Sequence, residues 1–352
     1  MKRRARSFAA LSLVLLLSAC GASQPETLSI LAMDTAMTFS VYGNDADTVL
    51  SDASLEVRRL DALLSRTNPE SAVTHLNAGD QLQVGEEVCG LLAAAQEYSA
   101  ATGGAFDITL APVSTAWGFT TDSYQVPSQE ELDALLAHVG MEHIHLTENT
   151  ASLDPGTQID LGAIAKGYAS DQLGALFERS GVERGWVSLG GNVLAWGSRP
   201  DGDPWEVGIQ DPAHPDDSSA LVCSLFLEDA FAVTSGSYQR YFEQDGKRYH
   251  HIIDPATGYP AESGLLQVTV VAGADAARED DGNPAGTGTM CDAFSTALFV
   301  MGEEKALDFW RSGAYEFDLI LVTDDGRVLV TDGLADRFTP MDGSEYSYET
   351  VS

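Results

Sequence analysis

The chain has 352 residues, 44% of them hydrophobic, and a formal net charge of −34 at pH 7. A chain of this length can build a large core in one domain or two. So acidic a surface repels nucleic acid and anionic lipid headgroups, which argues against either as a binding partner. It also repels phosphates, so a phosphorylated ligand would need local cationic groups.

Residues 1–19 have the pattern of a secretory signal peptide. The basic start "MKRRAR" precedes an apolar run that ends at Cys20 and is too short to span a bilayer comfortably. The ending "LSAC" resembles the lipobox of bacterial lipoproteins, in which the cysteine is lipidated and becomes the new N-terminus. The alternative is an ordinary signal peptide that contains a cysteine. Removal of residues 1–19 would change the formal net charge from −34 to −38.

We therefore expect a protein anchored through a lipid on Cys20 to the extracytoplasmic face of the cell membrane. Residues 20–26 would hold the lipidated cysteine and a flexible tether, residues 27–340 the folded domain, and residues 341–352 a polar C-terminal tail. The other cysteines, Cys89, Cys223 and Cys291, are dispersed and odd in number, which predicts small core residues rather than a disulfide framework.

Hydrophobic periodicity predicts a mixed architecture. We expect strands at 36–43, 186–190, 192–197, 205–209, 220–227, 247–253, 265–272, 316–323 and 327–331, and helices at 46–65, 86–100, 129–138, 162–180 and, as a pair, 291–311. The strands of the second half cluster as hairpins instead of alternating with helices. This predicts an α+β fold with a largely antiparallel β core and packed helices, not a doubly wound nucleotide fold. The acidic, Gly- and Ala-rich segment 273–290 is expected to be an exposed loop insertion.

The stretch "CDAFSTALFV", residues 291–300, combines an apolar helical pattern with two polar side chains. Asp292 and Thr296 are four residues apart and share one face of a helix. One interpretation is a cap, with Asp292 near the helix start and Thr296 bonded back to a carbonyl. The other interpretation is a metal site that uses both oxygens.

Five more stretches combine glycines with polar residues: "TGGAFDITLAPVSTAWGF" (102–119), "IDLGAIAKGYASDQL" (159–173), "VSLGGNVLAWG" (187–197), "AVTSGSYQRYF" (232–242) and "KRYHHIIDPATGYP" (247–260). Ordinary turns and hairpins could explain each of them separately. In the second, Lys166 falls in the first turn of a helix expected to begin near Ala163, where a bound anion would offset its charge; a solvated lysine is the alternative. In the fifth, His250 and His251 point to opposite faces of a strand, so one of them can face a site and act as a base.

Together these stretches predict a polar, glycine-lined cavity with one lysine, one histidine and several carboxylates. Neither a phosphate-binding P-loop, nor the dinucleotide fingerprint, nor a G-x-S-x-G elbow is present. In this order, the stretches resemble the FAD:protein FMN transferase family (ApbE type), and the resemblance extends from Met33 to about residue 331.

The resemblance implies an α+β fold related to the T-fold and a definite reaction. Family members cleave the pyrophosphate of FAD and join FMN to a threonine or serine hydroxyl of an acceptor protein, in a D-G-A-T- or S-G-A-T-like motif, with release of AMP. They use a divalent cation, usually Mg²⁺. No such acceptor motif occurs in this chain, so we do not expect it to modify itself.

The resemblance also implies roles for individual residues. Contacts with FAD are implied for Met33, Ala105, Phe106, Asp107, Asp160, Lys166, Ser235 and Ile253. Metal ligation is implied for the backbone carbonyl of Ala163 and for the side chains of Asp292 and Thr296. Catalytic roles are implied for His251, Asp292 and Lys166, with His251 as the base that accepts the proton of the acceptor hydroxyl. Asp34 stands where the family usually has glycine.

Two alternatives stay open at this point. The same site could use water as the acceptor, which would make the protein an FAD pyrophosphatase that yields FMN and AMP. The chain could also be a lipoprotein that binds FAD without chemistry, although such a carrier would not need a metal on the pyrophosphate.

Overall fold

The structure, a computed structural model, describes residues 24–121, 123–277 and 285–352. The predicted signal peptide, Cys20 and the middle of the 273–290 insertion lie outside the described residues. Within them, no helix combines the length and the apolar character needed to cross a membrane.

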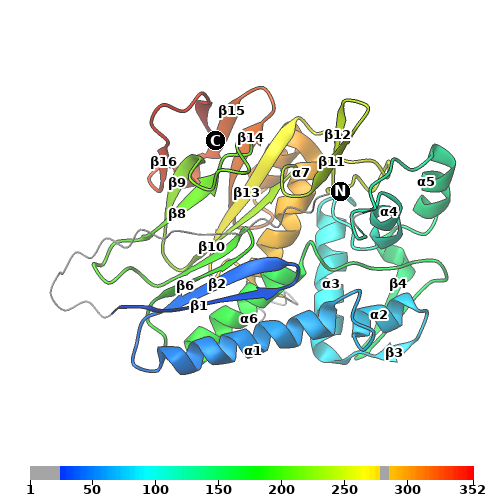
Figure 1. Cartoon of the computed structure of the whole chain (residues 1–352), viewed down its shortest axis with the longest axis horizontal. Coiled ribbons are helices and arrows are strands. Elements are labelled where there is room, and N and C mark those ends of the chain that lie inside the picture. The colour runs from blue at the N-terminus through cyan, green and yellow to red at the C-terminus, as the bar shows by residue number, and fades with distance from the viewer. Residues whose placement is uncertain (1–23, 122, 278–284) are drawn as a thin grey trace, which may run out of the picture.

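A nine-stranded sheet forms the centre of the molecule (Figure 1). In spatial order its strands are β1 (Glu26–Ala32), β2 (Thr35–Val41), β6 (Gly185–Leu189), β7 (Asn192–Trp196), β10 (Ala230–Gly236), β13 (Leu265–Gly273), β14 (Asp318–Thr323), β15 (Arg327–Thr331) and β17 (Ser347–Val351). All neighbours are antiparallel except β15 and β17, which are parallel. The predicted α+β fold with a largely antiparallel core is confirmed.

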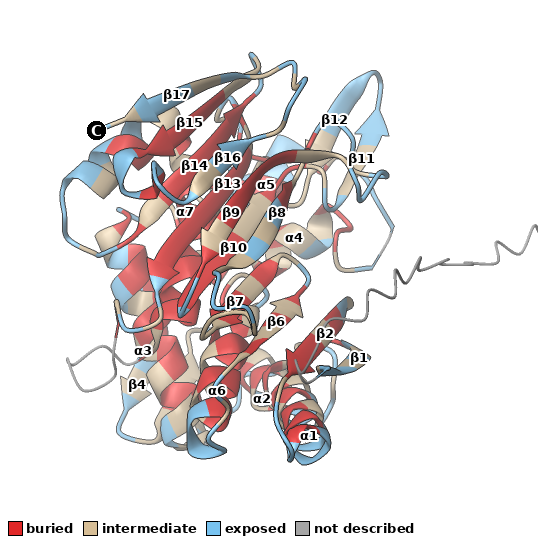
Figure 2. Ribbon diagram, turned by 90° about the vertical axis from the view of Figure 1, so that its left-hand side faces the viewer, coloured by how far each residue is buried: buried red, intermediate tan, exposed pale blue. Residues whose placement is uncertain are grey.

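Helices pack on one face of this sheet. The long ones are α1 (Ala46–Leu64), α3 (Gly85–Ala101), α6 (Ala165–Arg179) and α7 (Thr287–Arg311); α2 (Ala72–Asn77), α4 (Ala111–Ala116) and α5 (Gln129–Leu136) are short. The long helices and α2 form one large core with the sheet, because residues at helical spacing, such as Val57, Leu60 and Leu64 of α1, all turn inward. Figure 2 shows the buried stripe along these elements. Helices α4 and α5 instead belong to a separate cluster around Trp117.

The other face of the large sheet is covered by a three-stranded sheet of order β16 (Phe338–Pro340), β9 (Leu221–Leu227) and β8 (Trp205–Gln210). A second core fills the space between the two sheets. Two smaller sheets complete the fold: the hairpin of β11 (Tyr241–Gln244) and β12 (Lys247–His250), and the group β3 (Leu82–Gln83), β5 (Thr150–Leu153) and β4 (Ile144–Thr147). Single 3₁₀ turns lie at Met141–His143 and Asp332–Leu334.

Several boundaries differ from the predictions. The last helix begins at Thr287, so residues 287–290 of the expected loop are helical. The helical pair itself is confirmed, because Gly302 has a φ of 78° and breaks α7 in two. Strands β1, β10 and β17 were not predicted, and β17 places residues 347–351 of the expected polar tail in the large sheet. Strands β1 and β17 lie at the sheet edges, and in β1 the exposed Leu31 hides the alternation of burial in the hydrophobic pattern. The three cysteines of the described chain are buried and unpaired, as predicted.

Candidate active site

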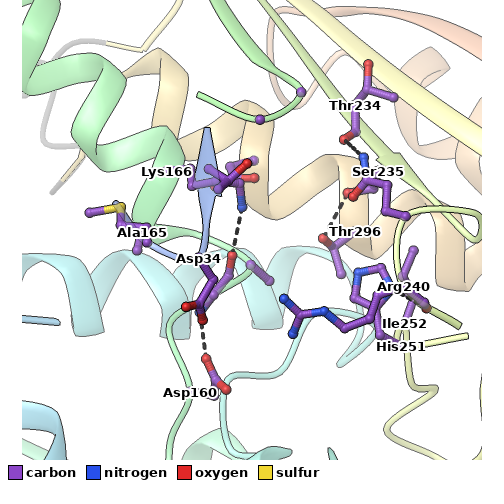
Figure 3. A pocket seen from close by; sticks show the side chains of 18 of the residues that line it. Asp34, Asp160, Ala165, Lys166, Thr234, Ser235, Arg240, His251, Ile252 and Thr296 are labelled. Atoms are coloured by element: carbon purple, nitrogen blue, oxygen red, sulfur yellow. Dashed lines mark hydrogen bonds between the residues drawn. The ribbon is translucent and has the colours of Figure 1, made fainter. Parts of the chain in front are cut away.

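A cavity of about 1270 Å³ opens where β2, β6, β7 and β10 meet the N-terminal end of α6 and the first half of α7. Every predicted site residue of the described chain lines it: Met33, Ala105, Phe106, Asp107, Asp160, Ala163, Lys166, Ser235, His251, Ile253, Asp292 and Thr296. These residues come from segments up to 263 positions apart, from Met33 to Thr296. The close-up in Figure 3 shows several of them directed at a common space.

Asp292 lies in the second turn of α7 and is 4% exposed. Its Oδ2 accepts a hydrogen bond from the backbone N–H of Gly167 at 2.8 Å. Helix α6 begins at Ala165, so this amide belongs to its first turn, where backbone donors have no partner within the helix. Asp292 therefore caps α6, and the alternative interpretation, that it caps its own helix, is wrong.

The start of α7 is capped by Asp171 of α6. Its carboxylate accepts hydrogen bonds from the backbone amides of Gly288 at 2.7 Å and Thr289 at 2.8 Å. The two helices thus cap each other, and they approach closely because both carry glycine at the crossing. A Cβ on Gly167 would lie 2.3 Å from the carbonyl oxygen of Gly288. This crossing fixes the place of Asp292 in the cavity wall.

Thr296 lies one turn after Asp292 and faces the same cavity. Its hydroxyl pairs with the hydroxyl of Ser235 at 3.2 Å, and Ser235 also pairs with Ser295 at 2.8 Å. These contacts link α7 to the end of β10 (Figure 3). The contact with Ser235, and not the alternative bond from Thr296 back to a carbonyl of its own helix, therefore positions this hydroxyl.

Lys166 stands in the first turn of α6, as predicted, although the helix begins at Ala165 and not near Ala163. Its ammonium donates to the carbonyl oxygen of Gly162 at 3.0 Å. Asp160 accepts a hydrogen bond from the amide of Gly162 at 2.8 Å and so closes the turn before the helix. Two amides of this turn are already paired, Ala165 with the carbonyl of Leu161 and Gly167 with Asp292, so an anion at this helix start would be held mainly by the Lys166 ammonium.

Two arginines of the cavity were not assigned from the sequence. Arg66, just after α1, donates to Asp160 at 3.3 Å and to Thr115 at 3.1 Å, and its buried Nε has no hydrogen-bond partner among the described residues. Arg240, at the start of the β11–β12 hairpin, donates to the carbonyl oxygen of Phe119 at 3.3 Å. Arg66 could not have been found by spacing, because it is 94 residues from Asp160 and only the fold joins them.

His251 follows β12 and lines the cavity, whereas His250 does not. One of the pair thus lines the cavity, but β12 ends at His250, so the expected strand 247–253 with the two histidines on opposite faces is too long. The ring nitrogen Nδ1 of His251 lies 3.2 Å from the carbonyl oxygen of Arg240. A carbonyl only accepts, so Nδ1 carries the proton and Nε2 presents its lone pair. Desolvation, with further help from the cationic Arg240 and Lys166, lowers the pKa of His251 to about 3, so the ring is neutral at pH 7.

Asp254 does not reach the cavity lining. Its carboxylate accepts from the amide of Ala256 at 2.9 Å and its carbonyl oxygen accepts from the amide of Gly258 at 2.8 Å, which builds the turn after the histidines. Trp117 donates to the carbonyl oxygen of Gly258 at 2.7 Å and ties this turn to an aromatic cluster. Asp254 is thus a turn residue that holds the His251 segment in place.

The turn between β1 and β2 consists of Met33 and Asp34, with φ of 46° and 57°. Both residues of a type I′ hairpin turn need positive φ, which favours glycine and, next, Asn and Asp. Asp34 can stand at this position because Asp adopts positive φ more readily than most residues other than glycine and asparagine. The Gly190–Gly191 pair likewise closes the predicted hairpin of β6 and β7, with φ of 63° and 99°.

Asp107 stands after the Gly103–Gly104 turn. Its Oδ1 accepts from the amide of Thr109 at 2.7 Å and from the Thr109 hydroxyl at 2.5 Å. Burial nevertheless raises its pKa, because desolvation outweighs these bonds. Beside it, Phe106 is 1% exposed and anchors the segment in the core.

Residues 33–321 match the ApbE family. The chain belongs to the ApbE family. The resemblance predicted from Met33 to about residue 331 is thereby confirmed. The protein is an enzyme of this family.

Named relatives agree with this assignment. The FAD:protein FMN transferase of Escherichia coli K12 is 35% identical over 261 residues, which are 71% of this chain and 70% of that protein. The one from Klebsiella pneumoniae is 33% identical over 320 residues, 89% of this chain and 94% of that protein. Among solved structures, the ApbE protein of Thermotoga maritima has a TM-score of 0.79 at 32% identity, covering 89% of this chain and 99% of that one. The apo flavinyl transferase ApbE of Pseudomonas stutzeri has a TM-score of 0.74 at 29% identity, covering 92% and 96%.

Proposed function

We propose that this member of the ApbE family is a FAD:protein FMN transferase. In this reaction the acceptor hydroxyl oxygen attacks the FMN phosphorus, the bond from that phosphorus to the bridging oxygen breaks, and AMP leaves with the bond electrons. The observation that supports it best is the gathering of every predicted site residue of the described chain in one cavity of a fold shared with flavin transferases.

The positive groups of the cavity suit a pyrophosphate. Lys166, Arg66 and Arg240 all line the cavity. The formal net charge of −34 does not prevent anion binding, because exposed charges beyond about 8 Å are screened at physiological salt whereas these groups would act at contact distance.

We infer that Mg²⁺ binds together with FAD. The protein offers a carboxylate oxygen of Asp292, the hydroxyl of Thr296 and the carbonyl of Ala163, and Mg²⁺ prefers such oxygen donors. Among the described residues, no group of three or more His, Cys, Asp or Glu side chains could hold a metal. Substrate phosphates would therefore have to complete the shell, as Mg²⁺ sites with one or two carboxylates commonly require. The ion would neutralise charge on the pyrophosphate.

His251 is suited to accept the proton of the acceptor hydroxyl. It is neutral, its tautomer is fixed by the Arg240 carbonyl, and Nε2 carries the lone pair. A pKa near 3 makes a weak base, but the negative pyrophosphate beside the ring would raise that pKa. Proton acceptance would thus become effective only after FAD has bound.

The test is a product balance. Purified protein is incubated with FAD and Mg²⁺, with and without EDTA, and with and without an acceptor protein that carries a D-G-A-T segment. AMP and free FMN are quantified, and the acceptor is weighed by mass spectrometry. AMP matched by FMN mass on the acceptor is the expected result. AMP with an equal amount of free FMN would indicate a pyrophosphatase, and FAD binding without AMP in any sample would refute both enzymatic functions.

A further inference from the structure

The cavity reaches both faces of the large sheet. Thr234 and Ser235 are consecutive residues of β10 and therefore point to opposite faces. Ser235 contacts Thr296 of α7 on the helix side, whereas Thr234 pairs with Thr269 of β13 at 2.9 Å. Both residues line the cavity. The cavity therefore extends around the strand ends to the face that is covered by the small sheet.

We call this second part the β8 lobe and define it by Ser188, Val193, Gly208, Gln210, Ala232 and Thr234. None of these six residues is charged, and Asp216 is the only charged lining residue that the β8–β9 connection adds among those described. The cationic groups Lys166 and Arg66 belong to the other part of the cavity. The two parts thus suit different ligands, one anionic and one uncharged.

Strand β8 forms a wall of this lobe with its edge. It is the terminal strand of its sheet, with only β9 beside it in the described part of the chain. Four consecutive residues, 207–210, line the cavity. Successive side chains of a strand point to opposite sides of the sheet. Four consecutive residues can therefore line one cavity only where the backbone edge of the strand faces that cavity.

The register shows which backbone groups that edge presents. The amide of Phe226 in β9 donates to the carbonyl oxygen of Arg337 beside β16, so the backbone groups of Phe226 point away from β8. In an antiparallel pair these directions alternate, so Leu225 turns toward β8 and exchanges hydrogen bonds with its partner Val207. The N–H and C=O of Gly208, the next residue of β8, therefore point to the free edge.

We propose that the acceptor segment that carries the modified hydroxyl binds as an extended strand along the free edge of β8. This inference rests on the proposed function and names the partner's site. An added strand satisfies the backbone groups at this edge irrespective of side-chain charge. The lobe is continuous with the part that holds Lys166 and Thr296, so a strand seated there can deliver its hydroxyl to the pyrophosphate.

Gly208→Pro and Gly208→Ala form a matched pair that tests this. Each places a Cβ near the flexible end of Leu221, whose Cδ1 would lie 2.8 Å away. Only proline removes the N–H that faces the free edge, and that N–H takes no part in the β8–β9 ladder. We expect FMN transfer by Gly208→Pro to fall at least tenfold below transfer by Gly208→Ala, while the two variants bind FAD with the same affinity.

A second measurement does not depend on how the variants fold. Amide hydrogen exchange of the wild-type protein is followed with a D-G-A-T peptide and with the same peptide N-methylated at alternate backbone positions. The expected result is slower exchange in residues 205–210 with the first peptide only. Equal transfer by the two variants, or peptide binding without protection of β8, would overturn the docking site. If the wild-type protein binds FAD but transfers no FMN, the proposed function fails. The docking site is then decided separately, by whether the peptide slows amide exchange in β8.

Discussion

Gly167→Ala adds one methyl group, and it should lower activity much more than it lowers stability. Helices α6 and α7 cross at Gly167 and Gly288, and the amide of Gly167 holds Asp292 in the cavity wall. A Cβ at residue 167 would lie 2.3 Å from the carbonyl oxygen of Gly288 and 2.6 Å from Cβ of Asp292. Both contacts are with atoms that cannot rotate away, so the helices must separate.

The size of the effect follows from these distances. An ordinary contact requires a separation of at least 3.4 Å, so the Gly288 carbonyl must move by about 1 Å. Overpacking of this kind costs about 1–3 kcal/mol, and alanine in a helix interior returns roughly 0.5–1 kcal/mol. The net loss of stability is therefore small. A misplacement of about 1 Å in the site, in contrast, can lower the rate about 10²-fold.

The assay pairs AMP release with thermal unfolding, and Gly174→Ala in the same helix is the control. A Cβ at Gly174 would meet Leu194 Cδ2 at 3.5 Å and Trp196 Cζ3 at 3.6 Å, which are ordinary contacts. We expect this variant to keep its activity and to gain slightly in stability, by up to about 1 kcal/mol. Equal activity of Gly167→Ala and Gly174→Ala would refute the view that the helix crossing positions Asp292.

Three other predictions concern charge and anchoring. Asp292→Asn keeps an oxygen that can accept the hydrogen bond from Gly167 but loses the negative charge, so metal-dependent AMP release should fall by about 10² or more. FAD affinity in EDTA, measured by flavin fluorescence, should change little. Unchanged AMP release would count against a metal role for Asp292. The pKa of His251 is about 3, below its unfolded value near 6.5, so its stabilising contribution is complete above pH 6.5 and is lost as the pH falls toward 3. Urea unfolding at pH 7 and pH 4.5 should therefore differ less for His251→Gln than for the wild type, and an equal difference would contradict the buried neutral ring. We also propose that Cys20 is lipidated: Cys20→Ser should move the protein from the membrane fraction to the soluble fraction, and a lipid-free mass for the wild type would refute this.

The sequence predicted much of the fold because its strongest signals are local. The apolar periodicity of α1 survives in the structure almost to the residue, with Ala46–Leu64 observed where 46–65 was expected. Turns that require positive φ, such as Gly190–Gly191, were also evident from the residues alone. The edge strands β1 and β17 were missed. Burial in β1 alternates from Leu28 to Ala32, but the exposed Leu31 hides this alternation in the hydrophobic pattern.

By itself, the sequence determined the fold class and the family, and it predicted a set of candidate site residues, because residue types and their order are properties of the chain. Only the tertiary structure decided what those residues do to each other. Asp292 was expected to be a metal ligand, with a cap of its own helix as the alternative; it caps α6, since the start of α7 is already held by Asp171. Arg66 contacts Asp160 only in the folded chain, because 94 residues separate the two along the sequence. Hydrogen bonds and charge interactions act over a few ångströms in space and are indifferent to distance along the chain, so these partnerships could not be read from spacing.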